Sequence, residues 1–193
     1  MISLTPSKTE LRTAALARRS ALSEADRAAA SDALARLAFS LPIAPDTIVA
    51  GYAPIRSEID PVPLMRALAK QGARLALPAI VARDAPLVFR AWTPELPLQP
   101  GAYGILAPAP EAPHLIPDIL LIPLAAFDRG GHRIGYGAGY YDRSLAQLRA
   151  VQPVTAVGLG FDTQEIADIP VGPHDVALDF VLTGTRVIDF RSR

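Results

Sequence analysis

The amino-acid sequence predicts an α/β protein of three layers, an open and mainly parallel sheet with helices on both faces, preceded by an N-terminal helical pair. Two observations carry this prediction. Short apolar runs of strand length alternate with segments whose apolar residues recur at helical spacing, which is typical of strand–helix–strand units. The most apolar of these runs, residues 118–124, has the composition of a buried strand at the centre of a sheet.

Two helices are expected before the first strand. Thr5 is a suitable cap for the first helix, and Pro6 occupies its first position, where the missing amide hydrogen costs least. Ser23, followed three residues later by Asp26, resembles a capping box at the start of the second helix. Apolar residues then recur at helical spacing until Pro42 ends the pattern.

The alternation of strands and helices begins at residue 47. A strand over 47–53, a helix over 63–72 that ends at Gly72 and a strand over 74–78 form one strand–helix–strand unit. The later expected elements are a helix from about Gly139 to Arg149 and strands over 87–92, 118–124, 154–160 and 179–183.

Length and composition favour one domain that acts on small molecules. The 193 residues are half apolar, which suffices for one core, so we expect a single domain over residues 1–193. Lysine plus arginine equal aspartate plus glutamate at 19 each, so no net field attracts nucleic acid or an anionic membrane. The chain has no cysteine and no apolar run of membrane-spanning length, and its first residues do not resemble a secretory signal. We expect a cytoplasmic monomer.

A glycine-rich segment over residues 133–143 lies between the central strand and the helix that follows it. Gly135, Gly137 and Gly139 stand at alternate positions, so the backbone can approach an anion closely, and amides at the next helix start point towards it. Ligands bind beyond the carboxyl ends of strands in such sheets, which favours a phosphate site. The spacing matches neither a dinucleotide-binding fingerprint nor a Walker loop, and a plain tight turn remains an alternative.

Charged and aromatic residues surround these glycines. Arg133 and Arg143 bracket the loop and can neutralise phosphate charge, while Asp142 can hold a hard cation. Asp142 can equally be a first-turn carboxylate favoured by the helix dipole. Three tyrosines offer faces for a heterocycle, although such residues are often the edge of a core: Tyr136, Tyr140 and Tyr141.

Residues 122–143, IPLAAFDRGGHRIGYGAGYYDR, resemble the signature of the 5-formyltetrahydrofolate cyclo-ligases, also called methenyltetrahydrofolate synthetases. The resemblance extends over nearly the whole chain. It begins with the KxxLR pattern of residues 8–12 and continues through residues 52–60, 63–78, 89–92, 101–105, 173–175 and 178–179.

This resemblance implies a reaction. 5-Formyltetrahydrofolate and ATP would give 5,10-methenyltetrahydrofolate, ADP and phosphate, with Mg²⁺ as cofactor. ATP would phosphorylate the formyl oxygen, and N10 would attack the activated carbon to close the ring. Such phosphoryl transfer depends mainly on in-line positioning and charge neutralisation.

The resemblance also implies roles for individual residues. Lys8 and Arg12, four apart on one helix face, would contact ATP phosphates, although such a pair alone is typical of a solvated face. The loop residues on ATP would be Arg133, Ile134, Gly135, Tyr136, Gly137, Ala138, Gly139, Tyr140 and Tyr141. Asp142 and Asp175 would hold Mg²⁺. The folate would meet Ala53, Glu58, Trp92, Tyr136, Gly139 and Tyr140, and the catalytic residues would be Arg133 and Tyr140.

Some of these assignments have structural alternatives. Glu58 can accept hydrogen bonds from a pterin, or it can cap the helix that begins near Pro61, and Trp92 can be ordinary core. The chain also departs from the family pattern twice. Ala107 stands where a glutamate is usual, and Ala138 stands where glycine or lysine is common.

Two other functions remain open from the sequence. A catalytically inactive nucleotide-binding regulator of the same fold would have no need of the retained residues Arg12, Arg133, Asp142 and Asp175. A related ATP-dependent enzyme for another formylated or pterin-like substrate is the stronger alternative, because Ala107 leaves the acceptor end less specified than the phosphate end.

Overall fold

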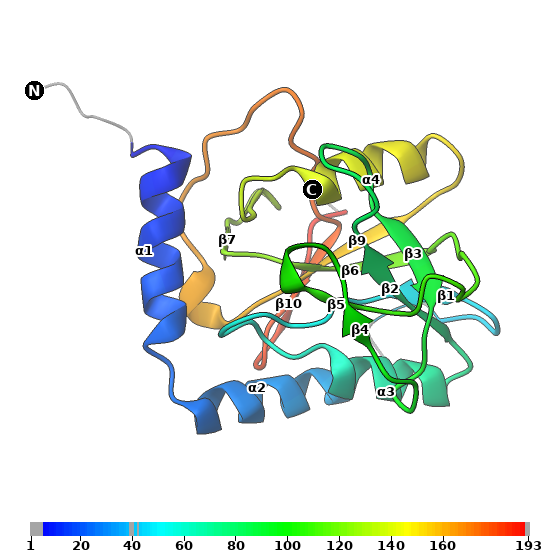
Figure 1. The fold of residues 1–193 in the computed structure, drawn as a ribbon. Coiled ribbons are helices and arrows are strands. Elements are labelled where there is room, and N and C mark those ends of the chain that lie inside the picture. Colours follow the sequence, from blue (N-terminus) through cyan, green and yellow to red (C-terminus); the bar gives the residue numbers. More distant parts are fainter. Residues whose placement is uncertain (1–5, 39–40, 42, 192–193) are drawn as a thin grey trace, which may run out of the picture.

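A computed structural model describes residues 6–38, 41 and 43–191. Its main element is a seven-stranded sheet in the order β11-β10-β9-β6-β1-β2-β3 (Figure 1). The strands are β1 (Ile48–Ala50), β2 (Arg74–Ala79), β3 (Val88–Ala91), β6 (Ile119–Pro123), β9 (Thr155–Leu159), β10 (Phe180–Leu182) and β11 (Val187–Asp189). Neighbours pair in parallel except at the two edges, where β3 and β11 are antiparallel. The predicted open, mainly parallel sheet is confirmed, with β6 at its centre and all five of its residues buried.

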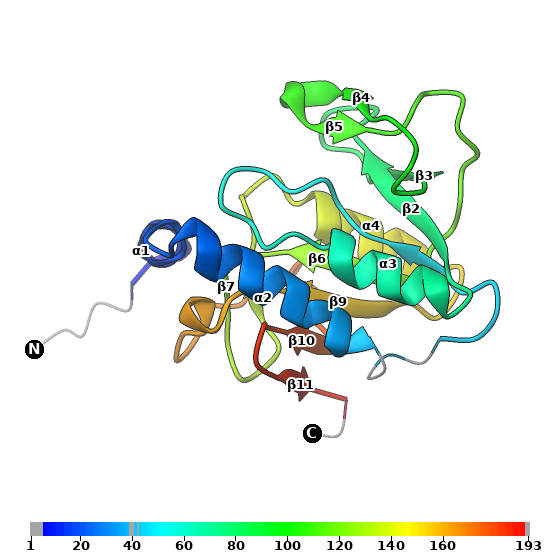
Figure 2. The ribbon, with the colours of Figure 1, turned by 90° about the horizontal axis from the view of Figure 1, so that it is seen from below.

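Helices cover both faces of this sheet, as predicted (Figure 2). α2 (Glu24–Arg36) and α3 (Val62–Lys70) pack together on one face, and α4 (Tyr140–Arg149) lies on the other. Side chains of β6 alternate between the two cores: Leu121 joins the α2 and α3 side, and Leu120 joins the α4 side. This alternation explains why the central strand reads as a continuous apolar run.

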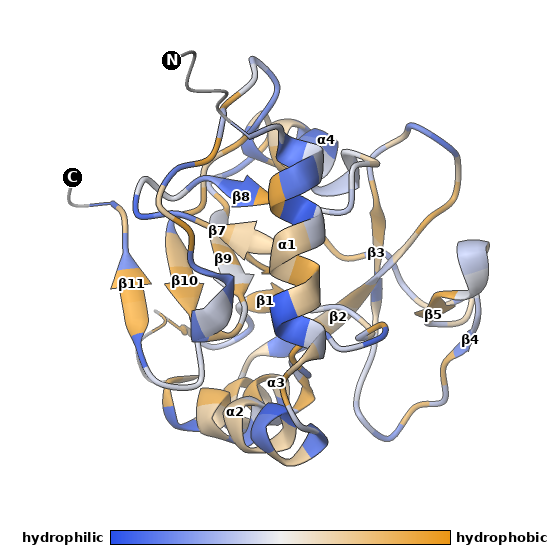
Figure 3. Ribbon diagram, turned by 90° about the vertical axis from the view of Figure 1, so that its left-hand side faces the viewer, coloured by the Kyte–Doolittle hydropathy of each residue, from blue (hydrophilic) through white to orange (hydrophobic). Residues whose placement is uncertain are grey.

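The predicted first helix is confirmed as α1 (Lys8–Ser20), but it begins two residues after Pro6, so Pro6 does not occupy its first position, and it does not share a layer with α2. It packs on β7 (Ala126–Phe127) and on the short helix η3 (Asp162–Gln164), beside the end of the sheet (Figure 3). The expected cap Thr5 lies outside the described residues. Ser7 caps α1, because its side chain accepts the Glu10 amide while Glu10 binds back to the Ser7 amide.

The second helix begins as expected and ends early. The Ser23 side chain accepts the Asp26 amide at 3.0 Å and caps α2. The helix stops at Arg36, although Leu41 keeps the helical spacing and is buried. Pro42, the expected end of the pattern, lies outside the described residues.

Three short features escape the sequence prediction. β4 (Gln99–Pro100) and β5 (Leu106–Ala107) form a hairpin with η2 (Ala102–Gly104) at its tip, and β7 pairs with β8 (Arg133–Ile134) in a second hairpin. The edge strand β11 is the third. Two-residue strands carry too few positions for a period of two to be recognised. No helix of the described part of the chain is long and apolar enough to cross a bilayer.

Candidate active site

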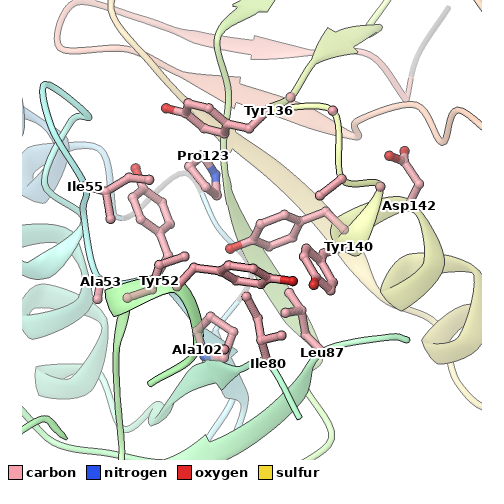
Figure 4. A pocket seen from close by; sticks show the side chains of 18 of the residues that line it. Tyr52, Ala53, Ile55, Ile80, Leu87, Ala102, Pro123, Tyr136, Tyr140 and Asp142 are labelled. Carbon is pink, nitrogen blue, oxygen red and sulfur yellow. The ribbon is translucent and has the colours of Figure 1, made fainter. Parts of the chain in front are cut away.

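A cavity of about 960 Å³ opens at the carboxyl ends of β1, β2 and β6. Tyr52 and Ala53, which follow β1, form one side of it, and Ile80 and Leu87 from the β2–β3 connection form another (Figure 4). The remaining walls come from the β4–β5 hairpin, the glycine loop and the N-terminal half of α1. This position is where open α/β sheets bind ligands.

The glycine loop adopts a backbone that other residues would adopt only with strain. Gly137 has φ of 94° and Gly139 has φ of 66°, and Gly139 is the N-cap of α4. Gly135 has no positive φ and has open space around an added Cβ, so only the last two glycines are required by conformation. The loop therefore presents the amides at the start of α4 beside the cavity, where the helix dipole favours an anion.

Cationic side chains of α1 reach this loop from a distant part of the sequence. The Arg12 Nε donates to the Gly135 carbonyl at 2.7 Å, and the Lys8 ammonium pairs with Asp175. Arg133, on β8, is buried, and its guanidinium donates to Asp142 Oδ1 at 2.6 Å. Burial lowers the pKa of Arg133, and the charges of Asp142 and Asp175 oppose that shift. The structure thus brings together Lys8, Arg12, Arg133, Asp142 and Asp175 around the cavity. The sixth charged candidate, Arg143, does not line it and donates to the Ala138 carbonyl at 2.7 Å.

Asp142 and Asp175 each leave one carboxylate oxygen available. Oδ1 of Asp142 accepts from Arg133 and from the Val176 amide at 3.2 Å, and Oδ2 of Asp175 accepts from Lys8 and the Gly172 amide. The other oxygen of each has no hydrogen-bond partner among the described residues. Burial opposes ionisation of Asp175, but the bonds from Lys8 and Gly172 outweigh it and hold its pKa below the ordinary value.

The available carboxylate oxygens of Asp142 and Asp175 fit a hard cation that also binds phosphate. Within the described ranges no group of three or more histidine, cysteine, aspartate or glutamate side chains could hold a metal alone. Magnesium typically uses one or two carboxylates together with phosphate oxygens and water, so two aspartates beside a phosphate loop suit it.

Glu58 forms the other end of the cavity. It is 9% exposed, and its Oε2 accepts the Ile55 amide at 2.8 Å. The capping alternative is wrong, because Asp60 Oδ1 accepts the Val62 amide at 2.9 Å at the start of α3. Burial raises the pKa of Glu58, and its bonds with the Tyr136 hydroxyl and the Ile55 amide oppose that rise.

Tyr136 links this carboxylate to a buried arginine that the sequence analysis did not select. Arg19 is 2% exposed; its Nη1 donates to the Tyr136 hydroxyl at 2.5 Å and its Nε to Ser57 Oγ at 3.1 Å. Its spacing of seven residues from Arg12, on the same face of α1, is the signal that could have found it.

The aromatic residues divide between cavity and core. Tyr140 lines the cavity, and its hydroxyl bonds with Tyr103 at the tip of the β4–β5 hairpin. Tyr103 is 71% exposed and also lines the cavity; it lies within residues 101–105, which the resemblance covers, but it is not among the predicted site residues. Trp92 does not reach the cavity: it is buried in the core, and its Nε1 donates to the Leu96 carbonyl at 3.1 Å. The core alternative weighed for Trp92 is the one that the structure supports.

The other predicted site residues line the same cavity. They are Ala53, Ile134, Gly135, Tyr136, Gly137, Ala138, Gly139 and Tyr141. Tyr141 also packs against the core on the α4 side, and burial raises its pKa, so its hydroxyl stays protonated.

Comparison with known proteins identifies the family. Residues 4–184 match the model of the 5-formyltetrahydrofolate cyclo-ligase family. The chain belongs to this family. It is 39% identical over 196 residues to a 5-formyltetrahydrofolate cyclo-ligase of Mycolicibacterium smegmatis, covering 94% of this chain and 96% of the relative. It is 31% identical over 177 residues to the cyclo-ligase of Escherichia coli, covering 88% and 96% of the two chains.

Solved structures agree with this cyclo-ligase assignment. A 5,10-methenyltetrahydrofolate synthetase of Aquifex aeolicus has a TM-score of 0.78 and 31% identity, covering 95% of this chain and 93% of that one. A second synthetase, from Mycoplasma pneumoniae, has a TM-score of 0.73 and 26% identity, covering 92% and 98%. The predicted family, fold class and enzyme class are therefore confirmed, and ATP is the co-substrate of such a ligase.

Both departures of this cyclo-ligase from the family pattern face the cavity. Ala138 lies in the glycine loop. Ala107 lies in β5, one strand of the β4–β5 hairpin, and is buried. Neither alters the pairing of Arg133 with Asp142 or of Lys8 with Asp175.

Proposed function

We propose that this cyclo-ligase converts 5-formyltetrahydrofolate and ATP to 5,10-methenyltetrahydrofolate, ADP and phosphate within the cavity described above. One observation carries the proposal: the glycine loop with its cations and the buried Glu58 open on the same cavity. A phosphate donor and a pterin can therefore be held at once, with the formyl group between them.

The formyl oxygen on N5 is a poor leaving group, which is why ATP is needed. Transfer of the γ-phosphoryl group to that oxygen breaks the bond to ADP and forms a phosphate ester. The N10 lone pair then attacks the formyl carbon, the C–O bond breaks, and inorganic phosphate leaves with the oxygen and the bonding electrons. The protein contributes mainly orientation and charge neutralisation to such a transfer.

The phosphate end would act through fixed charges. Loop amides between Gly135 and Tyr141, together with Lys8 and Arg12, would bind the ATP phosphates, and Arg133 would stabilise the charge that develops on the transferred group. Asp142 and Asp175 would hold Mg²⁺ through their available oxygens. When bound, the ion would neutralise phosphate charge and help to orient the phosphates.

The folate end would act through hydrogen bonds and packing. Ionised Glu58 can accept from adjacent amino and ring N–H groups of a pterin, and the protonated hydroxyl of Tyr136 keeps that carboxylate in place. Tyr140 with Tyr103 presents an aromatic surface near the formyl position. Ala53 and Gly139 leave room for the rings because they are small.

One assay tests this function. Purified protein, 5-formyltetrahydrofolate, ATP and Mg²⁺ should produce the methenyl chromophore and ADP in equal amounts, and a chelator in excess should stop both. Asp142→Asn should lower turnover and raise the Mg²⁺ concentration needed for half-maximal rate. An unchanged metal profile would remove Asp142 from metal binding, and ADP formed only with another formylated pterin would favour the alternative substrate that the Ala107 departure leaves open.

We also propose that the chain acts as a single-domain, cytoplasmic monomer without nucleic-acid or membrane partners. The absence of net charge and the single sheet shared by both halves of the chain support this. Light scattering during gel filtration measures the mass directly, and a value of twice 20.5 kDa would contradict the monomer.

A further inference from the structure

The charged residues that line the cavity are not all neutralised. Lys8 pairs with Asp175 and Arg133 pairs with Asp142, while the exposed Arg83 lies 3.6 Å from its neighbour Asp84. Two lining cations, Arg12 and Arg90, have no carboxylate within ion-pair distance among the described residues. They make only hydrogen bonds to backbone carbonyls, Arg12 to Gly135 and Arg90 to Pro108.

These two arginines lie on different walls. Arg12 projects from α1 onto the glycine loop, whereas Arg90 belongs to the edge strand β3 beside the β4–β5 hairpin. In Figures 1 and 2, α1 and β3 lie on opposite sides of β6. Arg90 therefore does not belong to the phosphate end.

The guanidinium of Arg90 is only partly satisfied. Its Nη1 donates to the Pro108 carbonyl at 3.2 Å, but its Nε is buried and has no hydrogen-bond partner among residues 6–38, 41 and 43–191. A half-buried cation with an orphaned donor carries a desolvation cost that an anionic ligand can offset. The planar guanidinium fork matches a carboxylate in a bidentate arrangement.

We propose that Arg90 binds the carboxylate of the glutamate tail of the folate. The inference rests on the proposed function, in which the two substrates bring two kinds of anionic group, the triphosphate of ATP and the carboxylates of glutamate. The glycine loop and Arg12 bind the triphosphate, and Arg90 binds the glutamate carboxylate on the opposite wall. A pterin held at Glu58 then leaves the tail directed towards β3.

The sequence of the hairpin supports this role in the present chain. Ala107, which precedes Pro108, lines the same cavity, and it occupies the position where a glutamate is usual in the family pattern. A carboxylate there would stand next to the carbonyl that Arg90 contacts and would compete for its guanidinium. The alanine leaves Arg90 free for substrate.

Two substrates and two variants test the proposal. KM is measured for 5-formyltetrahydrofolate and for 5-formyltetrahydropteroate, which lacks the glutamate, at saturating ATP. In the unmodified enzyme the glutamate-free substrate should show a KM about tenfold higher or more, because a charge-assisted hydrogen bond is lost. Arg90→Gln and Ala107→Glu should each raise KM for the glutamate-bearing substrate by a similar factor, with kcat and KM for ATP unchanged.

The matched control is Arg74→Gln, which removes an exposed arginine from the adjacent strand β2, away from the cavity lining. It should leave both KM values unchanged, which excludes a general effect of net charge. Equal KM values for the two substrates in the unmodified enzyme would overturn the proposal even if a variant failed to fold. So would an Arg90→Gln effect of equal size on both substrates. Absence of turnover with either substrate would instead refute the proposed function.

Discussion

Replacement of Arg19 by methionine tests whether the buried arginine of α1 organises the folate end of the site. Arg19 donates to Ser57 and to the Tyr136 hydroxyl, its guanidinium carbon lies 5.8 Å from the centre of the Tyr136 ring, and it opposes the burial that raises the pKa of Glu58. Methionine keeps most of the apolar stem and removes the donors. The Tyr136 hydroxyl and Glu58 then lose the cation that both share.

The expected loss of stability follows from these contacts. Each charge-assisted hydrogen bond contributes about 1.5–3 kcal/mol, so two lost bonds cost about 3–6 kcal/mol. Removal of a buried guanidinium also recovers part of its desolvation cost, which leaves a net loss of about 2–4 kcal/mol in the free energy of unfolding. A domain with an unfolding free energy of about 5–15 kcal/mol remains folded after such a loss.

Urea titration measures the stability, and steady-state kinetics measure the function. KM for 5-formyltetrahydrofolate should rise about tenfold, as expected for one displaced hydrogen bond to a charged group, while KM for ATP changes little. Arg18→Met is the matched control, because Arg18 is exposed and its side chain donates, within the described part of the chain, to the Thr163 carbonyl alone, at 2.9 Å. If Arg19→Met behaves like Arg18→Met in both measurements, the positioning role of Arg19 is refuted.

Three further variants test other parts of the site. Gly139→Ala places a side chain at φ of 66° and a Cβ 2.8 Å from Arg143 Nη1. The free energy of unfolding should therefore fall by about 1–2 kcal/mol, and KM for ATP should rise. Gly135→Ala is the stability control, because a Cβ added at Gly135 meets open space. Because burial raises the pKa of Glu58, its contribution to stability is full below the ordinary glutamate pKa and is lost as pH rises through the raised value. In urea titrations across pH, Glu58→Gln should remove the fall in stability that the unmodified enzyme shows as pH rises. In kinetics, the variant should lack the increase in KM for folate that the unmodified enzyme shows as pH falls through the raised pKa. A variant with the same pH profiles as the unmodified enzyme would contradict both expectations. Tyr103→Ala should raise KM for folate about two- to tenfold through lost aromatic packing with no loss of stability, and an unchanged KM would exclude Tyr103 from the folate surface.

The sequence predicts the parts of this fold that have a long, regular pattern. The run from 118 to 124 is apolar because β6 is buried on both faces, and the capping residue Ser23 locates the start of α2. The two-residue hairpin strands leave no such period, so the wall that carries Tyr103 could not be derived, whereas the strand that carries Arg90 was predicted over 87–92.

The site was predicted to the extent that a resemblance to known motifs covered it. Lys8, Arg12 and Asp175 lie far from the glycine loop along the chain, and only the fold brings them together. The resemblance implied a folate contact for Trp92, but this residue follows β3, is buried in the core and does not line the cavity. The sequence does not mark Arg19, because an arginine in an amphipathic helix is usually solvated and the burial of Arg19 depends on partners from distant segments.

The transfer of the formyl oxygen is the step that tests this mechanism most directly. 5-Formyltetrahydrofolate labelled with ¹⁸O in the formyl group is converted with unlabelled ATP, and the inorganic phosphate is analysed by mass spectrometry. If the cavity directs the γ-phosphoryl group onto the formyl oxygen, the released phosphate carries one ¹⁸O atom per turnover. Label found in water, with none in phosphate, would contradict that assignment.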